Sequence, residues 1–309
     1  MISILMGTYN GQEYIAEQVR SVLDQSHQDF VLHINDDAST DNTFDIAQQF
    51  GLEFPERISV TQNPSNSGCA KYNFIDMMIR IKDDYVMLCD QDDVWLPDKI
   101  DLTLKVMQKM ESKYGSNTPI LVHSDLRVVS EDLSNVISPS FRKAMGADYT
   151  RVKLREQIIQ NTLTGCTAMY NRSLADLIER EPEFMVMHDW WLMLTASAFG
   201  KIGVLDNQTV LYRQHRNNVV GAFDVRTLSY KINKLRRFPE IKKALNETYL
   251  QAGSFLNSYK YRLNNDQVQL LETYCQMPNM NKLMRWQTLC RLGTWKHGWS
   301  RKIACFLYI

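Results

Sequence analysis

Membrane-spanning and secretory features are missing from this sequence. No apolar run approaches the roughly 18 residues of a membrane-spanning helix. The opening residues, 1–6, include no basic segment, so we expect no signal peptide. The six cysteines, at positions 69, 89, 166, 275, 290 and 305, form no Cys-x-x-Cys pair. Together these absences favour a cytosolic protein whose cysteines are reduced thiols of the core.

Two common nucleotide-binding signatures are missing as well. No G-x-G-x-x-G follows the first predicted strand, and no Walker A pattern occurs. The chain also lacks net charge, with 35 Lys and Arg against 35 Asp and Glu. The charge is unevenly spread, however, because residues 222–309 hold 15 basic and 5 acidic residues, whereas residues 1–221 hold 20 and 30. This asymmetry predicts a body of residues 1–221 and a basic region of residues 222–309 with different partners.

The first hundred residues contain a regular alternation of strand and helix patterns. Short apolar runs predict strands at residues 2–7, 30–34, 57–61 and 85–89. A polar turn and then an amphipathic segment or a proline-started helix follow each run, and four such units imply a parallel, doubly wound sheet of the α/β class. Ligands bind such sheets at the edge where the strands end. We therefore expect this edge to bring together Thr8, Tyr9, Asp36, Asp37 and the loop of residues 90–93.

The loop Asp90-Gln91-Asp92-Asp93 places three carboxylates within four residues. Carboxylates this close repel one another, so a cation must lie nearby or one of them must take up a proton. Hard oxygen ligands with Asp-x-Asp spacing suit Mg²⁺ or Mn²⁺, and such metals are usually shared with substrate phosphates. A solvated acidic turn is the alternative. Pro97 is expected to begin the helix that follows.

Later parts of the chain give less regular patterns. Ser39 or Thr40 is expected to cap the helix after the second strand. Further strands are expected at residues 120–123, 163–170, near 204 and at 209–212, and residues 130–150 have a loop-like composition. His188 and Asp189 stand at the start of a predicted helix. From about residue 224 onward the apolar spacing is helical.

The last stretch, residues 281–309, has six Lys and Arg and no acidic residue. Apolar and aromatic residues alternate with these cations, among them Leu283, Met284, Trp286, Leu289, Leu292, Trp295 and Trp299. A basic, Trp-containing amphipathic segment can lie on an anionic membrane surface. The alternative is a helical cap whose apolar face packs on the body of the protein.

Five segments together resemble the inverting family 2 glycosyltransferases, which have the GT-A type of fold. They are Thr8-Tyr9-Asn10-Gly11, Asp36-Asp37-Ala38-Ser39-Thr40-Asp41, Asn66-Ser67-Gly68, Asp90-Gln91-Asp92-Asp93-Val94-Trp95 and His188-Asp189-Trp190. Gln91, Val94-Trp95 and Leu211-Tyr212-Arg213-Gln214-His215 resemble more narrowly the bacterial rhamnosyltransferases of cell-wall polysaccharides. The resemblance implies a Rossmann-like, mostly parallel sheet with flanking helices over residues 1–221 and a helical C-terminal extension over residues 222–309. The nucleotide-sugar half would be about residues 1–123 and the acceptor half about 124–221.

The same resemblance implies roles for individual residues. Asp189 would be the catalytic base, and the metal ligands would be Asp90, Asp92, Asp93 and His215. The donor nucleotide would be bound by Thr8, Tyr9, Asn10, Glu13, Asp36, Asp37, Asn66, Gly68, Lys71, Asp90 and Gln91. The acceptor would be bound by Trp95, Gly165, Cys166, His188 and Trp190.

Ordinary structural roles are open to four of these residues. Asp37 could be an Asx cap for the following helix, and Tyr9 could be a half-buried core aromatic. Asp189 could be the N-cap or a first-turn partner of the helix dipole. His215 could be a structural histidine with satisfied hydrogen bonds.

The activity implied is metal-dependent inverting transfer, with Mg²⁺ or Mn²⁺, of L-rhamnose from dTDP-L-rhamnose to a lipid-linked saccharide of bacterial cell-wall or capsular polysaccharide. A UDP-hexose-dependent enzyme of the same family and a non-catalytic sugar-nucleotide or glycan-binding module are the alternatives. The acidic body disfavours nucleic acid as a partner. We expect a cytoplasmic protein, peripheral at the inner face of the plasma membrane, and a homodimer is compatible with the sequence.

Overall fold

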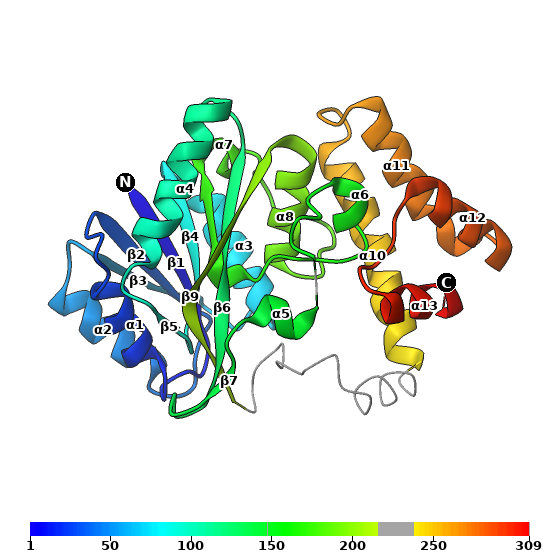
Figure 1. Cartoon of the computed structure of the whole chain (residues 1–309). Helices are drawn as coiled ribbons and strands as arrows, with labels where there is room; N and C mark the ends of the chain where they lie inside the picture. The colour runs from blue at the N-terminus through cyan, green and yellow to red at the C-terminus, as the bar shows by residue number, and fades with distance from the viewer. Residues whose placement is uncertain (147, 216–237, 309) are drawn as a thin grey trace. The chain divides into compact units, whose positions relative to one another are not determined.

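The computed structural model (Figure 1) describes residues 1–146, 148–215 and 238–308. The chain divides into two compact units. The sheet unit comprises Met1–Phe141, Leu163–Glu181 and Gly200–Ala222. The helical unit comprises Arg142–Thr162, Pro182–Phe199 and Phe223–Ile309. Asp189 belongs to the helical unit, whereas the acidic loop belongs to the sheet unit.

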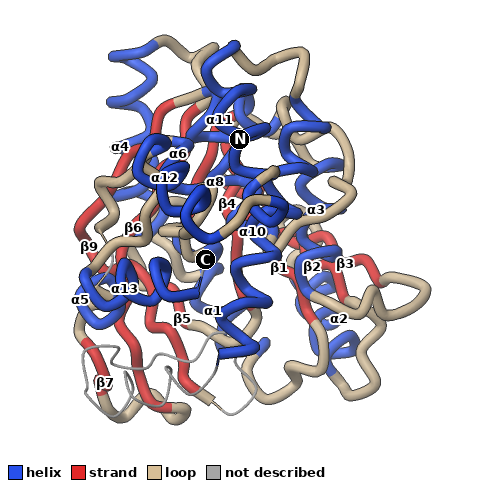
Figure 2. The backbone as a smooth tube through the Cα atoms, turned by 90° about the vertical axis from the view of Figure 1, so that its right-hand side faces the viewer, coloured by secondary structure: helices blue, strands red, loops and turns tan. Residues whose placement is uncertain are grey.

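Four parallel strands form the first part of the sheet, as the sequence predicts. They are β1 (Ile2–Thr8), β2 (Phe30–Asp36), β3 (Ile58–Gln62) and β4 (Tyr85–Asp90), in the spatial order β3-β2-β1-β4. The register pairs Gly7 with both Asn35 and Asp90, so the polar residues that end these strands lie at one edge. Figure 2 shows β1, β2 and β3 side by side.

Helices between the strands cover both faces of this sheet. They are α1 (Ile15–Leu23), α2 (Thr43–Glu53), α3 (Ala70–Arg80) and α4 (Lys99–Tyr114). In both views α4 and α3 lie on opposite sides of the strands (Figures 1 and 2). The apolar spacing of α1 explains its packing, because Ile15, Val19 and Val22 are all fully buried.

Two predicted helix starts are wrong. The helix α2 begins at Thr43, with Asn42 in the cap position, so neither Ser39 nor Thr40 caps it. The Ser39 hydroxyl donates to Asp36 instead, at 2.6 Å. The helix α4 begins at Lys99, two residues after Pro97.

Five further strands complete the sheet within the described residues. They are β5 (Val94–Trp95), β6 (Ile120–Ser130), β7 (Val136–Ser138), β8 (Ala168–Asn171) and β9 (Lys201–Gln214). The strand order continues from β4 through β8, β6 and β9 to β5, and β7 pairs with β6. The pairs β4–β8 and β6–β8 are antiparallel, whereas β6 and β9 run parallel. The sheet is therefore mixed, and the predicted α/β class is confirmed.

The predicted bounds of several strands and of one loop between residues 120 and 214 are wrong. The two strands expected near 204 and at 209–212 are one strand, β9, and the strand expected at 120–123 continues to Ser130. Residues 130–150, predicted as loop, contain β7 and the helix α5 (Phe141–Met145). The strand expected at 163–170 begins only at Ala168, after a 3-10 turn at Gly165–Thr167, and is followed by α7 (Arg172–Ala175).

The helical unit packs around buried aromatic side chains. Its main helices are α6 (Leu154–Gln157), α8 (His188–Phe199), α10 (Phe238–Tyr259), α11 (Asn265–Cys275), α12 (Lys282–Leu292) and α13 (Trp299–Tyr308), with a 3-10 turn at Met277–Asn279. Trp191 of α8 contacts Phe255 of α10 edge-on, with ring centroids 5.2 Å apart. The helical pattern predicted from residue 224 is confirmed over 238–308, and its first part, 224–237, lies outside the described residues.

No helix within the described part of the chain has the length and apolarity that crossing a bilayer requires.

Candidate functional site

Asp36 lies fully buried at the end of β2, where four donors surround its carboxylate. Thr8 Oγ1, which ends β1, donates to Asp36 Oδ1 at 2.9 Å. The main-chain N–H and the hydroxyl of Ser39 donate at 2.8 and 2.6 Å, and Gln62 Nε2 donates at 3.0 Å. These bonds tie the loops after β1, β2 and β3 together. Asp36 and Thr8 are thus neighbours, as predicted.

Asp37 binds the loop after β3 and does not cap α2. Its carboxylate accepts from Asn63 Nδ2 at 2.7 Å and from the hydroxyl and main-chain N–H of Ser67 at 2.7 and 3.0 Å. Asn66 Nδ2 donates to the Asp37 carbonyl, and Gly68 takes a left-handed conformation, φ +84°, directly after this contact. The alternative role of Asp37 as an Asx cap is therefore wrong. Its carboxylate, 3% exposed, lies at the predicted edge.

Tyr9 and Asn10 form an exposed loop after β1. The Tyr9 side chain is 45% exposed, so the alternative of a half-buried core aromatic is wrong. Asn10 has φ +46°, and its Oδ1 accepts from the main-chain N–H of Thr40 at 2.9 Å. Glu13 is exposed just before α1, and Lys71 Nζ of α3 lies 5.0 Å from the Tyr72 ring centroid. The structure thus brings Tyr9 and Asn10 to the edge that Thr8 and Asp36 occupy.

The three acids of the acidic loop, residues 90–93, differ in environment. Asp90 ends β4 and is partly exposed. Asp92 Oδ2 lies 2.8 Å from His215 Nε2, and the side chains are 18% and 6% exposed. Asp93 is fully buried, with Oδ1 accepting the main-chain N–H of Arg213 at 3.2 Å. Burial and the neighbouring carboxylates of Asp92 and Asp90 raise the pKa of Asp93 well above its usual range.

Cys166 lies against this loop from the 3-10 turn before β8. Ligand atoms of Asp90, Asp93 and Cys166 all lie within 4.8 Å of one another. Burial, and then the Asp93 carboxylate, raise the pKa of the Cys166 thiol, so the thiolate that binds metals is disfavoured. The better donors for a hard cation are therefore the carboxylate oxygens of this loop.

A buried lysine lies beneath the loop. Lys99, at the start of α4, is fully buried, and its Nζ lies 4.6 Å from the ring centroid of Trp95. Burial lowers the pKa of the Lys99 ammonium to about 8. Trp95 is only 2% exposed and Gly165 is buried too, so the structure places both predicted acceptor residues inside the protein.

The remaining predicted residues lie in the first turn of α8, in the helical unit. Asp189 is partly exposed, and Trp190 donates its indole N–H to the carbonyl of Gln157 at 2.7 Å. His188 is 5% exposed, and burial lowers its pKa to about 3. His188 is therefore neutral at pH 7. The roles assigned to these three residues stay predictions.

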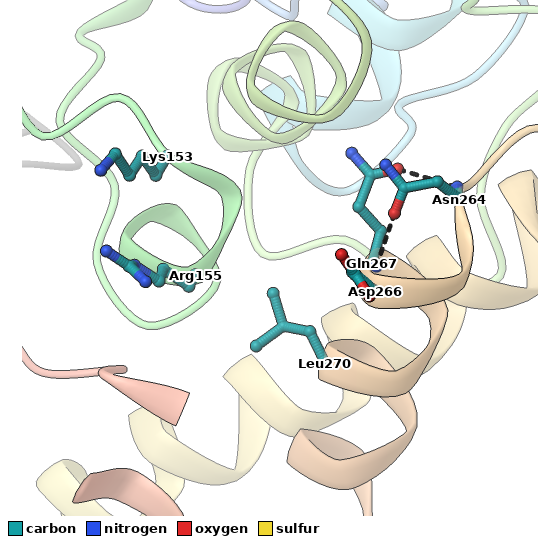
Figure 3. Close-up of a pocket in the computed structure, with 6 residues that line it drawn as sticks. All are labelled: Lys153, Arg155, Asn264, Asp266, Gln267 and Leu270. Carbon is teal, nitrogen blue, oxygen red and sulfur yellow. Dashed lines mark hydrogen bonds between the residues drawn. The ribbon is translucent and has the colours of Figure 1, made fainter. Parts of the chain in front are cut away.

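The helical unit also has a cavity of about 250 Å³ (Figure 3). It is lined by Lys153, Arg155, Asn264, Asp266, Gln267 and Leu270. The side chain of Asn264 accepts the main-chain N–H of Gln267 at 2.9 Å, and the Gln267 side chain accepts that of Asn264 at 3.0 Å. These polar groups thus cap α11, and the predicted site residues lie elsewhere.

Two residues beside the acidic loop have no predicted role, Arg213 and Tyr14. Arg213 bonds to the main chain of Asp92, and the Tyr14 ring stacks on the imidazole of His215. Arg213 stands in the segment Leu211-Tyr212-Arg213-Gln214-His215, which carries part of the family resemblance, and it is a charged residue directly after the strand predicted at 209–212. Sequence alone gave no partner for that charge.

The family model "Glycosyl transferase family 2" matches residues 3–178. Among curated proteins, dTDP-rhamnosyl transferase RfbG of Shigella flexneri is 32% identical over 226 residues, which are 70% of this chain and 74% of that protein. The putative teichuronic acid biosynthesis glycosyltransferase TuaG of Bacillus subtilis is 30% identical over 207 residues, or 66% of this chain and 75% of that protein.

Solved structures share the fold at low identity. TarS of S. aureus, residues 1–349 in complex with UDP, matches with a TM-score of 0.56 and 17% identity over 91% of this chain and 73% of that one. The mannosyltransferase PcManGT of Pyrobaculum calidifontis, with GDP-Man and Mn²⁺, matches with a TM-score of 0.50 and 14% identity over 95% of this chain and 85% of that one. With its mixed, mostly parallel sheet of GT-A type and the family model spanning residues 3–178, this chain belongs to glycosyltransferase family 2.

Proposed function

We propose that this glycosyltransferase transfers L-rhamnose, with inversion, from dTDP-L-rhamnose to a lipid-linked saccharide in bacterial cell-wall or capsular polysaccharide synthesis. The observation that carries the reaction class is the pairing of Asp92 with His215, 2.8 Å apart, at the sheet edge where Asp90 ends β4. The relative from Shigella flexneri, described as a dTDP-rhamnosyl transferase, supports the choice of donor.

The donor nucleotide would lie along the ends of β1, β2 and β4. Asp37 would accept the N3–H of the pyrimidine, because a carboxylate is an acceptor for an imide N–H. The exposed ring of Tyr9 offers an apolar surface for the base or ribose. Asn63 and Ser67 already orient the Asp37 carboxylate, so little reorganisation is needed when a base arrives.

A divalent cation fits the donor set of the acidic loop. Asp90 and Asp92 would hold it through oxygen, with His215 as a nitrogen ligand and Asp93 buried beneath them. Asp93 would be a further oxygen ligand, since it offers a ligand atom within 4.8 Å of one of Asp90. A bound Mg²⁺ or Mn²⁺ would supply Lewis-acid stabilisation of the charge on the leaving nucleoside diphosphate.

Asp189 would act as the general base. It takes the proton of the acceptor hydroxyl while that oxygen attacks C1 of the sugar. The bond from C1 to the phosphate oxygen breaks in the same displacement, and its electron pair leaves with the nucleoside diphosphate. Attack on the face opposite the leaving group converts a β-L-rhamnosyl donor into an α-L-rhamnoside. No covalent intermediate forms, so no second nucleophilic carboxylate is needed.

The alternative hypothesis is that the donor is a UDP-hexose. One TarS structure contains UDP and another contains UDP-GlcNAc, and the shared fold is compatible with such a donor. A non-catalytic binding module is the rival from another class. It has no need of a base, so a separate aspartate at the start of α8 favours the enzyme.

The basic C-terminal region would place the enzyme at an anionic membrane surface, on the cytoplasmic side where its lipid-linked acceptor lies. Part of its apolar stripe packs within the helical unit: Leu289 is fully buried, and Trp286 stacks on Phe306 with centroids 3.9 Å apart. Another part faces solvent, since Trp299 and Ile303 are 82% and 54% exposed. The buried residues of the stripe pack the helices together, and the exposed ones would be free to contact a membrane. Cations such as Lys302 flank the exposed part.

Isothermal titration of dTDP and of UDP, each with and without Mn²⁺, tests the proposal. We expect binding that needs Mn²⁺ and favours dTDP, followed by transfer in an assay with dTDP-L-rhamnose. An Asp92→Asn variant should lose the metal dependence, whereas Asp132→Asn, which alters an exposed acid in the turn between β6 and β7, should not. A preference for UDP would replace rhamnose by a hexose, and failure to bind either nucleotide would contradict the assignment as an enzyme.

A further inference from the structure

Arg213, near the end of β9, contacts several separate parts of the candidate site. Its main-chain N–H donates to Asp93 Oδ1 at 3.2 Å, and its Nε donates to the carbonyl of Asp92 at 2.9 Å. Its Nη1 donates to the carbonyl of Glu131, and its Nη2 donates to Glu17 Oε2 at 2.5 Å. The side chain is only 4% exposed, so water competes little for these bonds.

Tyr14, in the turn before α1, connects Arg213 with His215. The guanidinium carbon of Arg213 lies 5.1 Å from the Tyr14 ring centroid. The imidazole of His215 stacks on the same ring, with centroids 4.8 Å apart and 23° between the planes. The Tyr14 hydroxyl donates to Glu131 Oε1 at 2.6 Å, which fixes the ring in place. Since His215 in turn contacts Asp92, these contacts form a closed ring.

Arginine suits this position better than any other residue. Its five N–H donors lie in one plane in a fixed fork, so one side chain can hold the carbonyls of Asp92 and Glu131 and the carboxylate of Glu17 together. Its charge is permanent and lies beside a loop of mutually repelling carboxylates. Lysine would keep the charge but lose the planar fork.

We propose that Arg213 and Tyr14 are positioning residues that hold the Asp92 carboxylate and the His215 imidazole in the orientation needed to bind a divalent cation. The proposal rests on the proposed function, because it takes Asp92 and His215 as metal ligands. Arg213 holds the main-chain carbonyl of Asp92 and the carboxylate of the next residue, Asp93, and Tyr14 fixes the plane of the imidazole. Groups that orient metal ligands typically change metal affinity 10–100-fold when they are removed.

Electron paramagnetic resonance of free Mn²⁺ measures this binding directly, without an activity assay. The titration uses the full chain with saturating dTDP or UDP. We expect Arg213→Lys and Tyr14→Leu each to raise the Mn²⁺ dissociation constant by about 10–100-fold. Tyr14→Phe keeps the ring and should stay closer to wild type than Tyr14→Leu. The control is Arg172→Lys, which changes an arginine of a surface ion pair with Asp176 and should leave Mn²⁺ affinity unchanged.

Melting temperatures of the same samples separate positioning from unfolding. A folded Arg213→Lys protein with wild-type Mn²⁺ affinity would overturn the positioning proposal and leave the metal site standing. If that variant fails to fold, Tyr14→Leu decides in its place, since wild-type affinity there equally overturns the proposal. A wild-type protein that binds no Mn²⁺ with either nucleotide would overturn the metal-dependent proposed function, and this inference with it.

Discussion

Tyr9 and Gln91 exchange two hydrogen bonds, each 2.9 Å long. The main-chain N–H of Tyr9 donates to Gln91 Oε1, and Gln91 Nε2 donates to the Tyr9 carbonyl. The glutamine side chain thereby pairs with the main chain as a neighbouring strand would. Gly11 leaves room for it, because a Cβ at that position would lie only 2.3 Å from Gln91 Oε1. The middle residue of the Asp-x-Asp thus joins the exposed loop of Tyr9 and Asn10 after β1 to the acidic loop.

Replacing Gln91 by Leu should weaken donor binding. The substitution keeps a similar volume but removes both bonds to Tyr9, which are worth about 1 kcal/mol each. Since the loop of Tyr9 must then be ordered by the donor, we expect the KM for the sugar nucleotide to rise by about tenfold, with a smaller change in kcat. Gln12→Leu is the control, because Gln12 bonds instead to the main chain of Asn42. An unchanged KM in Gln91→Leu would show that the pairing does not order the donor loop.

Asp189→Asn should abolish transfer and spare nucleotide binding. The amide is nearly isosteric but cannot take the proton of the acceptor hydroxyl, and removal of a general base typically costs 10²–10⁴-fold in rate. Steady-state transfer rates and titration of the nucleotide on the same protein separate the two effects. Glu183→Gln alters another acid of the helical unit, one that lies on the exposed surface, and should behave as wild type. Full activity of Asp189→Asn would refute the assignment of the base.

Local sequence signals were enough to predict the parallel half of the sheet. Short apolar runs such as 30–34 and 85–89, each followed by a turn and a helix, permit few other arrangements. The short strand β5 gave no such signal, because two residues carry no periodicity and its existence depends on pairing of Val94 with Leu211, more than a hundred residues away. The cap expected of Ser39 failed for a related reason, since its hydroxyl bonds to the buried Asp36 instead.

The candidate site was predictable only where its residues follow strands. The contact of Thr8 with Asp36 follows from two strands that end at one edge. The contact of Asp92 with His215 joins residues 123 positions apart, and the sequence only suggested it through a family resemblance. The role of Arg213 could not be predicted, because burying its charge is tolerable only with partners at residues 17, 92 and 131 that no local pattern brings together.

The stability of the protein should fall as the pH drops below about 6.5 because of His188. Burial lowers the pKa of His188 from 6.5 to about 3, so the folded state binds fewer protons than the unfolded state between these values. The neutral ring carries no charge penalty above pH 6.5, and stability is lost progressively as the pH falls from there toward about 3. Urea unfolding at pH 7 and pH 5 measures this slope. The His188→Gln variant should show a shallower dependence, and an equal slope would contradict the assignment.

Exposed side chains of α13 should carry the proposed membrane contact. Trp299 and Ile303 stand four residues apart, so they lie on one helix face, and Lys302 lies beside the Trp299 ring, with Nζ 5.8 Å from the ring centroid. Their transfer into the headgroup region would remove apolar surface from water, at about 25 cal/mol per Å². Replacing both by Ser should therefore weaken binding to vesicles that contain anionic lipid by tenfold or more, as measured by co-sedimentation.

Two controls make the vesicle measurement decisive. Leu52→Ser removes an equally exposed apolar residue, 83% exposed, from α2 of the sheet unit and should leave vesicle binding unchanged. Raising the salt concentration should weaken binding of the wild type, because each Lys or Arg near an anionic surface contributes about 1 kcal/mol and is screened by ions. Wild-type binding by the Trp299→Ser, Ile303→Ser double variant would exclude this helix face as the contact. Equal binding of the wild type to neutral and anionic vesicles would show that its basic residues contribute nothing to membrane binding.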